Sequence, residues 1–237
     1  MKKLLLILIA FSQTTLFANN IFDDTKLLEN INDKNSQFYY PLLMNRYMAG
    51  DMTLDDNDYY HLYYGFAYNI NYEPYKTVND NDLIYQTLST DKPEKSDYVK
   101  AINFLESSLK QEPFNLGSLN LLTFFYEETG DNQNALKNSH RLNMIIRTIM
   151  SSGTGKKEKS PFQIIYKQHA EDILNFLEIP YKQKMVVSIY CDYYQFYRKT
   201  NGTKGYYFDQ RRMNNKEKEI AVPNQNSGFE INGLRIK

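Results

Sequence analysis

The 237-residue chain contains one cysteine, no tryptophan and three histidines. A single cysteine excludes a disulfide scaffold and a zinc module with four cysteine ligands. The 28 basic and 28 acidic residues cancel, and this balance excludes a strongly basic nucleic-acid binder. His61, His140 and His169 lie far apart and form none of the short motifs of zinc enzymes. We therefore predict no metal site, no cofactor and no nucleic-acid partner.

Long apolar runs are also scarce, and the clearest one lies at the beginning of the chain. Lys2 and Lys3 precede the apolar residues 4–11, and the small residue Ala18 follows a short polar stretch. This order is typical of a cleaved secretory signal peptide, and the apolar part is shorter than the roughly 20 residues that cross a bilayer. We expect residues 1–18 to be a signal peptide. The mature protein is then exported, periplasmic or secreted, without a transmembrane anchor.

Proline and glycine mark the first helices of the mature chain. Residues 19–37 form a polar segment rich in asparagine and aspartate. Pro41 suits the first turn of a helix, and Gly50 suits the position just after its end. Thr53 and Asp56 then resemble the capping box at the start of a second helix.

The most regular pattern lies between residues 96 and 150. Ala101 and Ala135 occupy equivalent places in two similar segments and stand 34 positions apart, which is the tetratricopeptide period. A small alanine lets two antiparallel helices cross closely, Gly130 suits the turn between helices, and Pro113 lies where one helix must stop. We predict a tetratricopeptide-like helical region over residues 38–150. One complete repeat and one half-repeat match, which argues against a long superhelical array.

The composition changes after this region. Residues 151–161 are rich in glycine, serine and lysine and are predicted to be a flexible linker. Residues 162–212 are predicted to be a β-rich segment with one short helix, and the dipeptide at 201–202, Asn-Gly, indicates a hairpin. Residues 213–237 lack periodicity and are predicted to be a disordered tail. The predicted fold class is α+β, mainly α, with tetratricopeptide-like hairpins followed by a small C-terminal β-rich segment.

The chain has 21 tyrosines, and many of them crowd between residues 39 and 75. One interpretation places their rings in the core, where each hydroxyl finds a partner. The other is a tyrosine-lined groove that holds a peptide or a sugar, with an arginine as anchor. The groove interpretation selects the candidate partner-binding residues Arg46, Tyr47, Asp51, Tyr60 and Tyr64.

Several short passages resemble a known family when they are taken together. They are YPLLMNRYMAGD at 40–51, YHLYYG at 60–65, YEPY at 72–75, SSGTG at 151–155, CD at 191–192 and GYYF at 205–208. The set is similar to a family of exported Gram-negative bacterial proteins known only as a domain of unknown function, DUF4919. The resemblance covers about residues 38–208. It implies an exported, tetratricopeptide-like helical region with a β-rich end, and it supplies no catalytic residue.

The function that these features favour is a non-catalytic binding or scaffold protein of the cell envelope. Its partner is expected to be a protein or peptide, and the sequence leaves the oligomeric state open. Two alternatives remain. One is a periplasmic enzyme acting near Cys191 and Asp192, with His169 as a further polar group, and the other is a carbohydrate-binding protein that stacks sugars on tyrosine rings.

Overall fold

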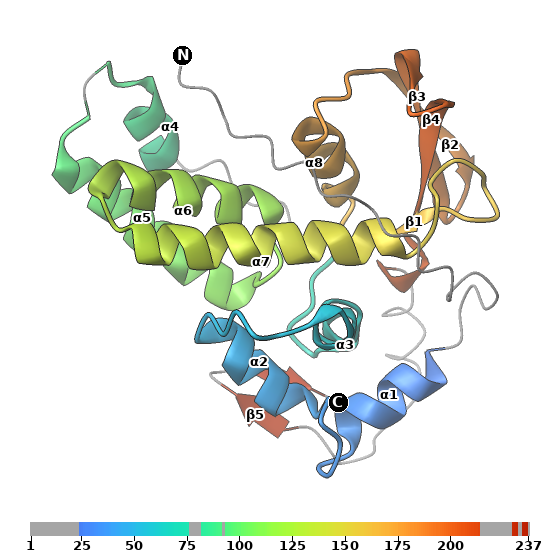
Figure 1. Ribbon diagram of the computed structural model, residues 1–237, viewed down its shortest axis with the longest axis horizontal. Helices are drawn as coiled ribbons and strands as arrows, with labels where there is room; N and C mark the ends of the chain where they lie inside the picture. Colours follow the sequence, from blue (N-terminus) through green and yellow to red (C-terminus); the bar gives the residue numbers. More distant parts are fainter. Residues whose placement is uncertain (1–23, 76–81, 92, 214–228, 232–233, 237) are drawn as a thin grey trace.

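The computed structural model describes residues 24–75, 82–91, 93–213, 229–231 and 234–236 (Figure 1). The predicted signal peptide and residues 19–23 therefore lie outside the described residues, as do residues 214–228 of the predicted tail. No helix in the described ranges is both long enough and apolar enough to cross a membrane.

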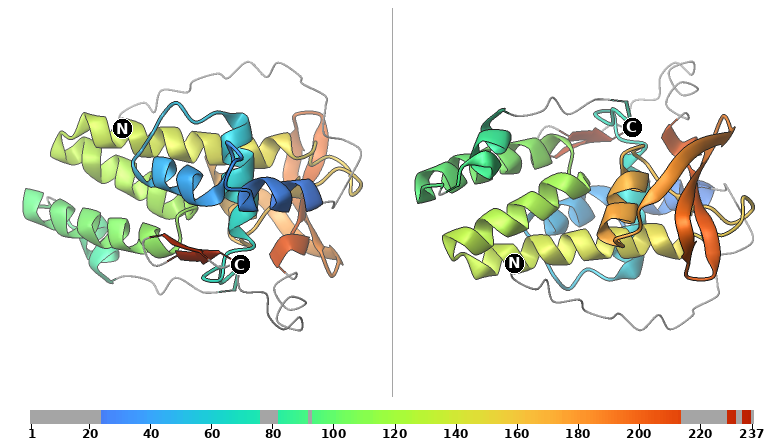
Figure 2. Two further views of the ribbon diagram at one scale, coloured as in Figure 1. Left: turned by 90° about the horizontal axis from the view of Figure 1, so that it is seen from below. Right: turned by 90° about the horizontal axis from the view of Figure 1, so that it is seen from above.

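The fold is α+β and mainly α, as predicted, with two groups of helices and a small sheet at one end. Helices α5, α6 and α7 lie side by side, and α4 packs beside α5 (Figure 1). Helices α1, α2 and α3 form the second group, and α3 crosses α7 steeply (Figures 1 and 2). Helix α8 packs beside the sheet. The helices are α1 (Thr25–Asn32), α2 (Tyr40–Met48), α3 (Asp56–Phe66), α4 (Asp82–Ser89), α5 (Lys95–Gln111), α6 (Leu116–Thr129), α7 (Asn132–Ser151) and α8 (His169–Phe176).

The start of α3 differs in detail from the sequence prediction. Asp55 caps this helix, because its carboxylate accepts hydrogen bonds from the backbone N–H groups of Asn57 and Asp58. The carboxylate of Asp58 accepts one in return from the N–H of Asp55, which completes a capping box. Thr53, the predicted cap, instead donates its hydroxyl to Asp51. The capping box is real but begins two residues later than predicted.

Glycine and proline end the helices where the sequence indicates. Gly50 follows α2 with a φ of +75°, and Gly130 follows α6 with a φ of +82°. Pro113 lies just beyond the end of α5. The two alanines that define the repeat, Ala101 and Ala135, are both buried where α6 packs between α5 and α7.

The sheet has four strands in the order β1-β4-β3-β2. Strand β1 is parallel to β4, and the other pairs are antiparallel. The strands are β1 (Phe162–Gln163), β2 (Tyr181–Ser188), β3 (Cys191–Thr200) and β4 (Thr203–Asp209). A turn at residues 189–190 joins β2 to β3. The hairpin predicted at Asn201 and Gly202 joins β3 to β4, and both residues have positive φ values, as a type I′ turn requires.

The segment 151–161, predicted to be a flexible linker, is folded against the sheet. The N–H of Gly155 donates to the carbonyl of Ser160, and the carbonyl of Gly155 accepts from the N–H of Tyr207. A Cβ on Gly155 would lie 2.3 Å from the Phe162 ring, so only glycine allows this close approach. The loop therefore ties α7 to β1 and β4.

The predicted disordered tail contains a short hairpin in its described part. Strands β5 (Phe229–Ile231) and β6 (Leu234–Ile236) pair in antiparallel register. Strand β5 lies beside α2 (Figure 1).

Candidate functional site

The tyrosine-rich segment fills the core between the two helix groups. Six of its tyrosines are almost completely buried: Tyr40, Tyr47, Tyr59, Tyr63, Tyr64 and Tyr72. The hydroxyl of Tyr40 donates to the carbonyl of Leu62 at 3.0 Å, and that of Tyr72 donates to the carbonyl of Ile165. These six rings therefore lie in the core, as one of the two interpretations of the tyrosine-rich segment expects.

Two of the five candidate residues, Arg46 and Asp51, brace the loop between α2 and α3. The Nε of Arg46 donates to the Oδ2 of Asp51 at 2.7 Å, and its Nη2 donates to the hydroxyl of Thr53 at 3.1 Å. Hydrogen bonds from Thr53 and then from Arg46 lower the pKa of Asp51 to about 2. Both residues are thus engaged with their own loop.

Tyr60 and Tyr64, two further candidate residues, lie one helical turn apart on α3. The Tyr64 ring carries the guanidinium of Arg212 4.2 Å from its centroid, and its hydroxyl donates to the carbonyl of Gln163. Tyr60 is half-buried and packs edge-on against Tyr64. Because Tyr64 is fully buried, its ring has no face on which a sugar could stack.

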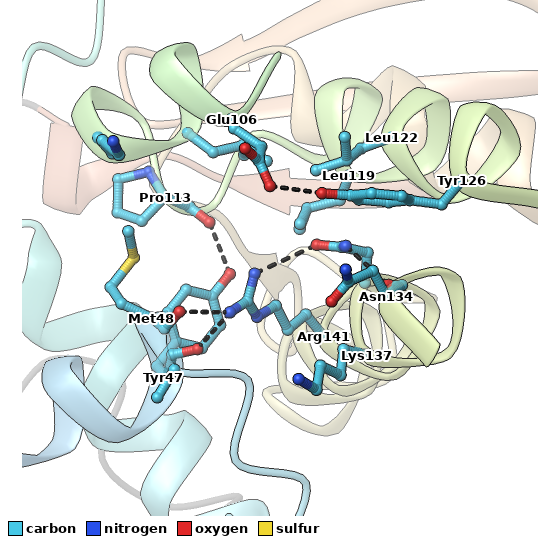
Figure 3. Close-up of a pocket in the computed structure, with 14 residues that line it drawn as sticks. Tyr47, Met48, Glu106, Pro113, Leu119, Leu122, Tyr126, Asn134, Lys137 and Arg141 are labelled. Carbon is cyan, nitrogen blue, oxygen red and sulfur yellow. Dashed lines mark hydrogen bonds between the residues drawn. The ribbon is translucent and has the colours of Figure 1, made fainter. Parts of the chain in front are cut away.

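Tyr47, the remaining candidate, lines a cavity that the sequence did not indicate (Figure 3). This partly open cavity of about 220 Å³ lies between the end of α2 and helices α5, α6 and α7. Its apolar lining is made of Met48, Ala49, Leu109, Pro113, Leu119 and Leu122. Its polar lining comes from Tyr47, Glu106, Lys110, Tyr126, Asn134, Lys137, Asn138 and Arg141.

Arg141 forms the centre of the cavity wall. Its Nη2 donates to the carbonyls of Tyr47 at 2.7 Å and Met48 at 2.9 Å, at the C-terminal end of α2 (Figure 3). Its Nη1 donates to the side chain of Asn138 at 3.2 Å. The guanidinium also lies 5.0 Å from the Tyr47 ring centroid, a cation–π contact. A cation at this place complements the negative end of the α2 dipole.

Polar groups continue on the opposite wall. The hydroxyl of Tyr126 donates to the carboxylate of Glu106 (Figure 3). Burial and this neighbour raise the pKa of Tyr126. Tyr47 donates its hydroxyl to the carbonyl of Pro113 at 2.6 Å, which connects α2 to the turn between α5 and α6. The cavity therefore offers hydrogen-bonding groups that hold one another in place.

One sequence signal could have indicated the side of the cavity that α7 forms. Four polar residues of α7, Asn134, Lys137, Asn138 and Arg141, are spaced by three and four positions and share one helix face. The tetratricopeptide pattern lies in the apolar residues of the same helix and does not include this polar stripe.

His169 belongs to a buried hydrogen-bond chain. Its Nε2 lies 3.0 Å from the carbonyl of Phe114, which only accepts, so Nε2 carries the hydrogen. Its Nδ1 therefore accepts from the hydroxyl of Tyr63 at 2.7 Å, and Tyr63 accepts from the N–H of Ile165. Burial lowers the pKa of His169 to about 3, so the ring is neutral at physiological pH.

Cys191 and Asp192 are also held in structural positions. Burial, with smaller contributions from nearby carboxylates, raises the pKa of the Cys191 thiol to about 12. The thiol is therefore protonated near neutral pH, whereas nucleophilic cysteines act as thiolates. Asp192 is buried and pairs with Lys184 at 3.0 Å. In the described part of the chain, no three His, Cys, Asp or Glu side chains gather as a metal site.

Fold and site together define a mainly helical α+β protein with a polar-walled cavity between its helix groups. A family model described as "Domain of unknown function (DUF4919)" matches residues 25–219. The chain belongs to this family, which confirms the resemblance seen in the short sequence passages. The comparisons with curated proteins and with solved structures gave no match.

Proposed function

We propose that the chain is a non-catalytic binding module of the cell envelope that holds a segment of a protein or peptide partner. The binding site is the cavity between α2 and helices α5 to α7, and these three helices serve as a tetratricopeptide-like frame. The partly open cavity with its polar walls is the observation that carries the proposal. The tyrosine groove of the sequence hypothesis is thus replaced by a neighbouring concavity, to which only Tyr47 of the five candidates contributes.

The cavity's composition favours binding over catalysis. Its lining among the described residues contains no serine, cysteine, threonine, histidine or aspartate. Nucleophilic catalysis needs an activated nucleophile beside a base. The lining supplies amide, guanidinium, ammonium, hydroxyl and apolar groups and one carboxylate, which can orient and bury a ligand.

The cavity's size favours a small part of a larger partner. Sites that enclose a drug-sized molecule have volumes of roughly 300–1,000 Å³. The cavity of about 220 Å³ is smaller, and it suits one side chain or the end of a peptide.

A plug in the cavity tests the proposal. Ala49 is exposed, lines the cavity and has ordinary helical backbone angles, so Ala49→Phe should fill the space without disturbing the fold. Leu42→Phe is the matched control, because Leu42 is an exposed residue of α2 outside the cavity lining. A synthetic octapeptide library is incubated with each purified protein, and retained peptides are identified by mass spectrometry. We expect retention by the unmodified protein and the control, and at least a tenfold loss in Ala49→Phe. Equal retention by all three proteins would contradict the proposal.

Location in the envelope depends on the predicted signal peptide. N-terminal sequencing of the protein from fractionated cells should find a chain that begins near residue 19 in the exported fraction. An uncut chain in the cytoplasmic fraction would contradict this part of the proposal.

A further inference from the structure

The cavity has an uncompensated positive charge. Lys110, Lys137 and Arg141 line it, and Glu106 is the only carboxylate in its described lining. In the described part of the chain, no carboxylate oxygen lies within 4 Å of any of these three cations, although other arginines do have such partners. Those that pair with carboxylates are Arg46, Arg147, Arg211 and Arg212.

The groups that do contact Arg141 leave its charge largely in place. Two of its hydrogen-bond acceptors are backbone carbonyls of α2, and the third is the amide oxygen of Asn138. These groups carry only partial negative charge. The Nε of Arg141 is buried and has no acceptor among the described residues. A buried donor without an acceptor is uncommon in folded proteins and is unfavourable.

We infer that the ligand of this cavity presents a carboxylate, from either the C-terminus or an acidic side chain of a peptide, to the excess positive charge that Lys110, Lys137 and Arg141 give to its lining. The positive charge of Arg141 strengthens the attraction for the carboxylate. The apolar residues Leu109, Leu119 and Leu122 contact the carbon atoms beside the carboxylate. The inference rests on the proposed function and specifies the chemistry of the ligand.

A carboxylate suits the site better than a phosphate. Glu106 adds a negative charge to the wall opposite Arg141 (Figure 3). Three cations still face this one carboxylate, so the preference for a carboxylate over a phosphate comes from size and not from charge. The small volume favours a planar carboxylate on a short stem.

The test compares two matched octapeptide libraries. One has free C-termini and contains Asp and Glu, and the other is amidated and has Asn and Gln in their place. We expect the unmodified protein to retain the acidic library at least tenfold more strongly. Raising the salt concentration should weaken this preference, because partly exposed charges are screened.

Variants of the two lysines locate the charge. Lys110→Gln/Lys137→Gln should reduce retention of the acidic library about tenfold and leave the neutral library unchanged. Lys182→Gln, at an exposed lysine of β2 outside the cavity lining, is the control and should behave as the unmodified protein does. Equal melting temperatures of the three proteins establish that the fold is intact.

The outcomes separate this inference from the proposed function. If both libraries bind equally and Ala49→Phe abolishes both, the carboxylate inference is overturned and the binding cavity stands. If inorganic phosphate displaces the acidic peptides at lower concentration than acetate does, the carboxylate preference is also overturned. If Ala49→Phe changes retention of neither library, both proposals fall.

Discussion

At the scale of single residues, burial decides what the polar side chains do. His169 and Cys191 look chemically versatile in the sequence. In the fold, burial keeps the imidazole neutral and the thiol protonated. The Tyr63 hydroxyl that meets His169 is part of the same buried network. The hydrogen bonds of His169 with the Tyr63 hydroxyl and the Phe114 carbonyl connect α3, α8 and the turn between α5 and α6.

The neutral state of His169 predicts a pH dependence of stability. An unfolded histidine binds its proton near pH 6.5, whereas the pKa of His169 in the native protein is about 3. Between these values the unfolded state binds one more proton, so stability falls as the pH is lowered. The contribution of His169 is about 1.4 kcal/mol per pH unit, and the loss is complete only below pH 3.

The comparison with His169→Gln isolates this contribution. Glutamine can both donate and accept hydrogen bonds but does not titrate. Burial also lowers the pKa values of His61 and His140, and it raises that of Asp172 to about 6, which opposes the histidines below pH 6. In urea unfolding, the stability of the unmodified protein should fall relative to His169→Gln by about 0.7 kcal/mol from pH 7 to 6 and by about 1.2 kcal/mol from pH 6 to 5. If the free energies of unfolding of the two proteins changed equally with pH, a buried neutral His169 would be contradicted.

At the scale of elements, short-range signals are strong where backbone geometry requires a particular residue. The hairpin between β3 and β4 turns at Asn201 and Gly202, whose φ values are 50° and 78°. The same reasoning identifies Gly50 and Gly130 as helix ends. Each of these positions depends on neighbouring residues alone.

Gly202→Ala should destabilise the protein by about 1–2 kcal/mol, because an L residue is unfavourable in the left-handed region. A Cβ there would meet no atom within 4 Å, so the cost comes from the backbone and not from a clash. Gly117→Ala is the control, since this exposed glycine of α6 has ordinary contacts and a helical backbone. The control should gain up to about 1 kcal/mol of stability. Urea unfolding measures both changes in stability. An unchanged free energy of unfolding in Gly202→Ala would argue against the type I′ turn.

At the scale of the whole molecule, a buried ion pair joins the two ends of the main described region. Arg212 follows β4, and Asp24 precedes α1. Arg212 donates from Nη2 to Asp24 at 2.6 Å and from Nε at 2.8 Å, a two-point contact. Tyr68 donates a further hydrogen bond to the same carboxylate at 2.6 Å, and Arg212 also packs on the Tyr64 ring.

Removing either partner of this ion pair should strongly destabilise the protein. Arg212→Met leaves Asp24 buried and unpaired, and it should cost about 3–5 kcal/mol, as should Asp24→Leu. The double variant should cost less than the sum of the two, because neither charge is then left alone. Arg147→Met is the control: its pair with Asp56 is exposed, and it should cost at most about 1 kcal/mol. Additive losses in the cycle would contradict a coupled pair.

The cavity is also a property of the whole molecule. Tyr47, Glu106 and Arg141 come from three helices that are separated by dozens of residues. The hydrogen bonds of α2 with Arg141, in the middle of α7, and with Pro113, just after α5, bring these groups to one space. The candidate residues Arg46 and Asp51 are close to Tyr47 in sequence, yet they belong to a surface loop brace.

The sequence by itself determined the local structure and the family. Helix ends at Gly50 and Gly130, the turn at Asn201 and the mainly helical α+β class all follow from interactions between nearby residues. The tertiary structure alone decided which tyrosines are buried, why His169 is neutral and the Cys191 thiol protonated near neutral pH, and where the cavity lies. The physical reason is that burial and cavity shape depend on contacts between distant segments, and residue spacing along one chain does not contain that information.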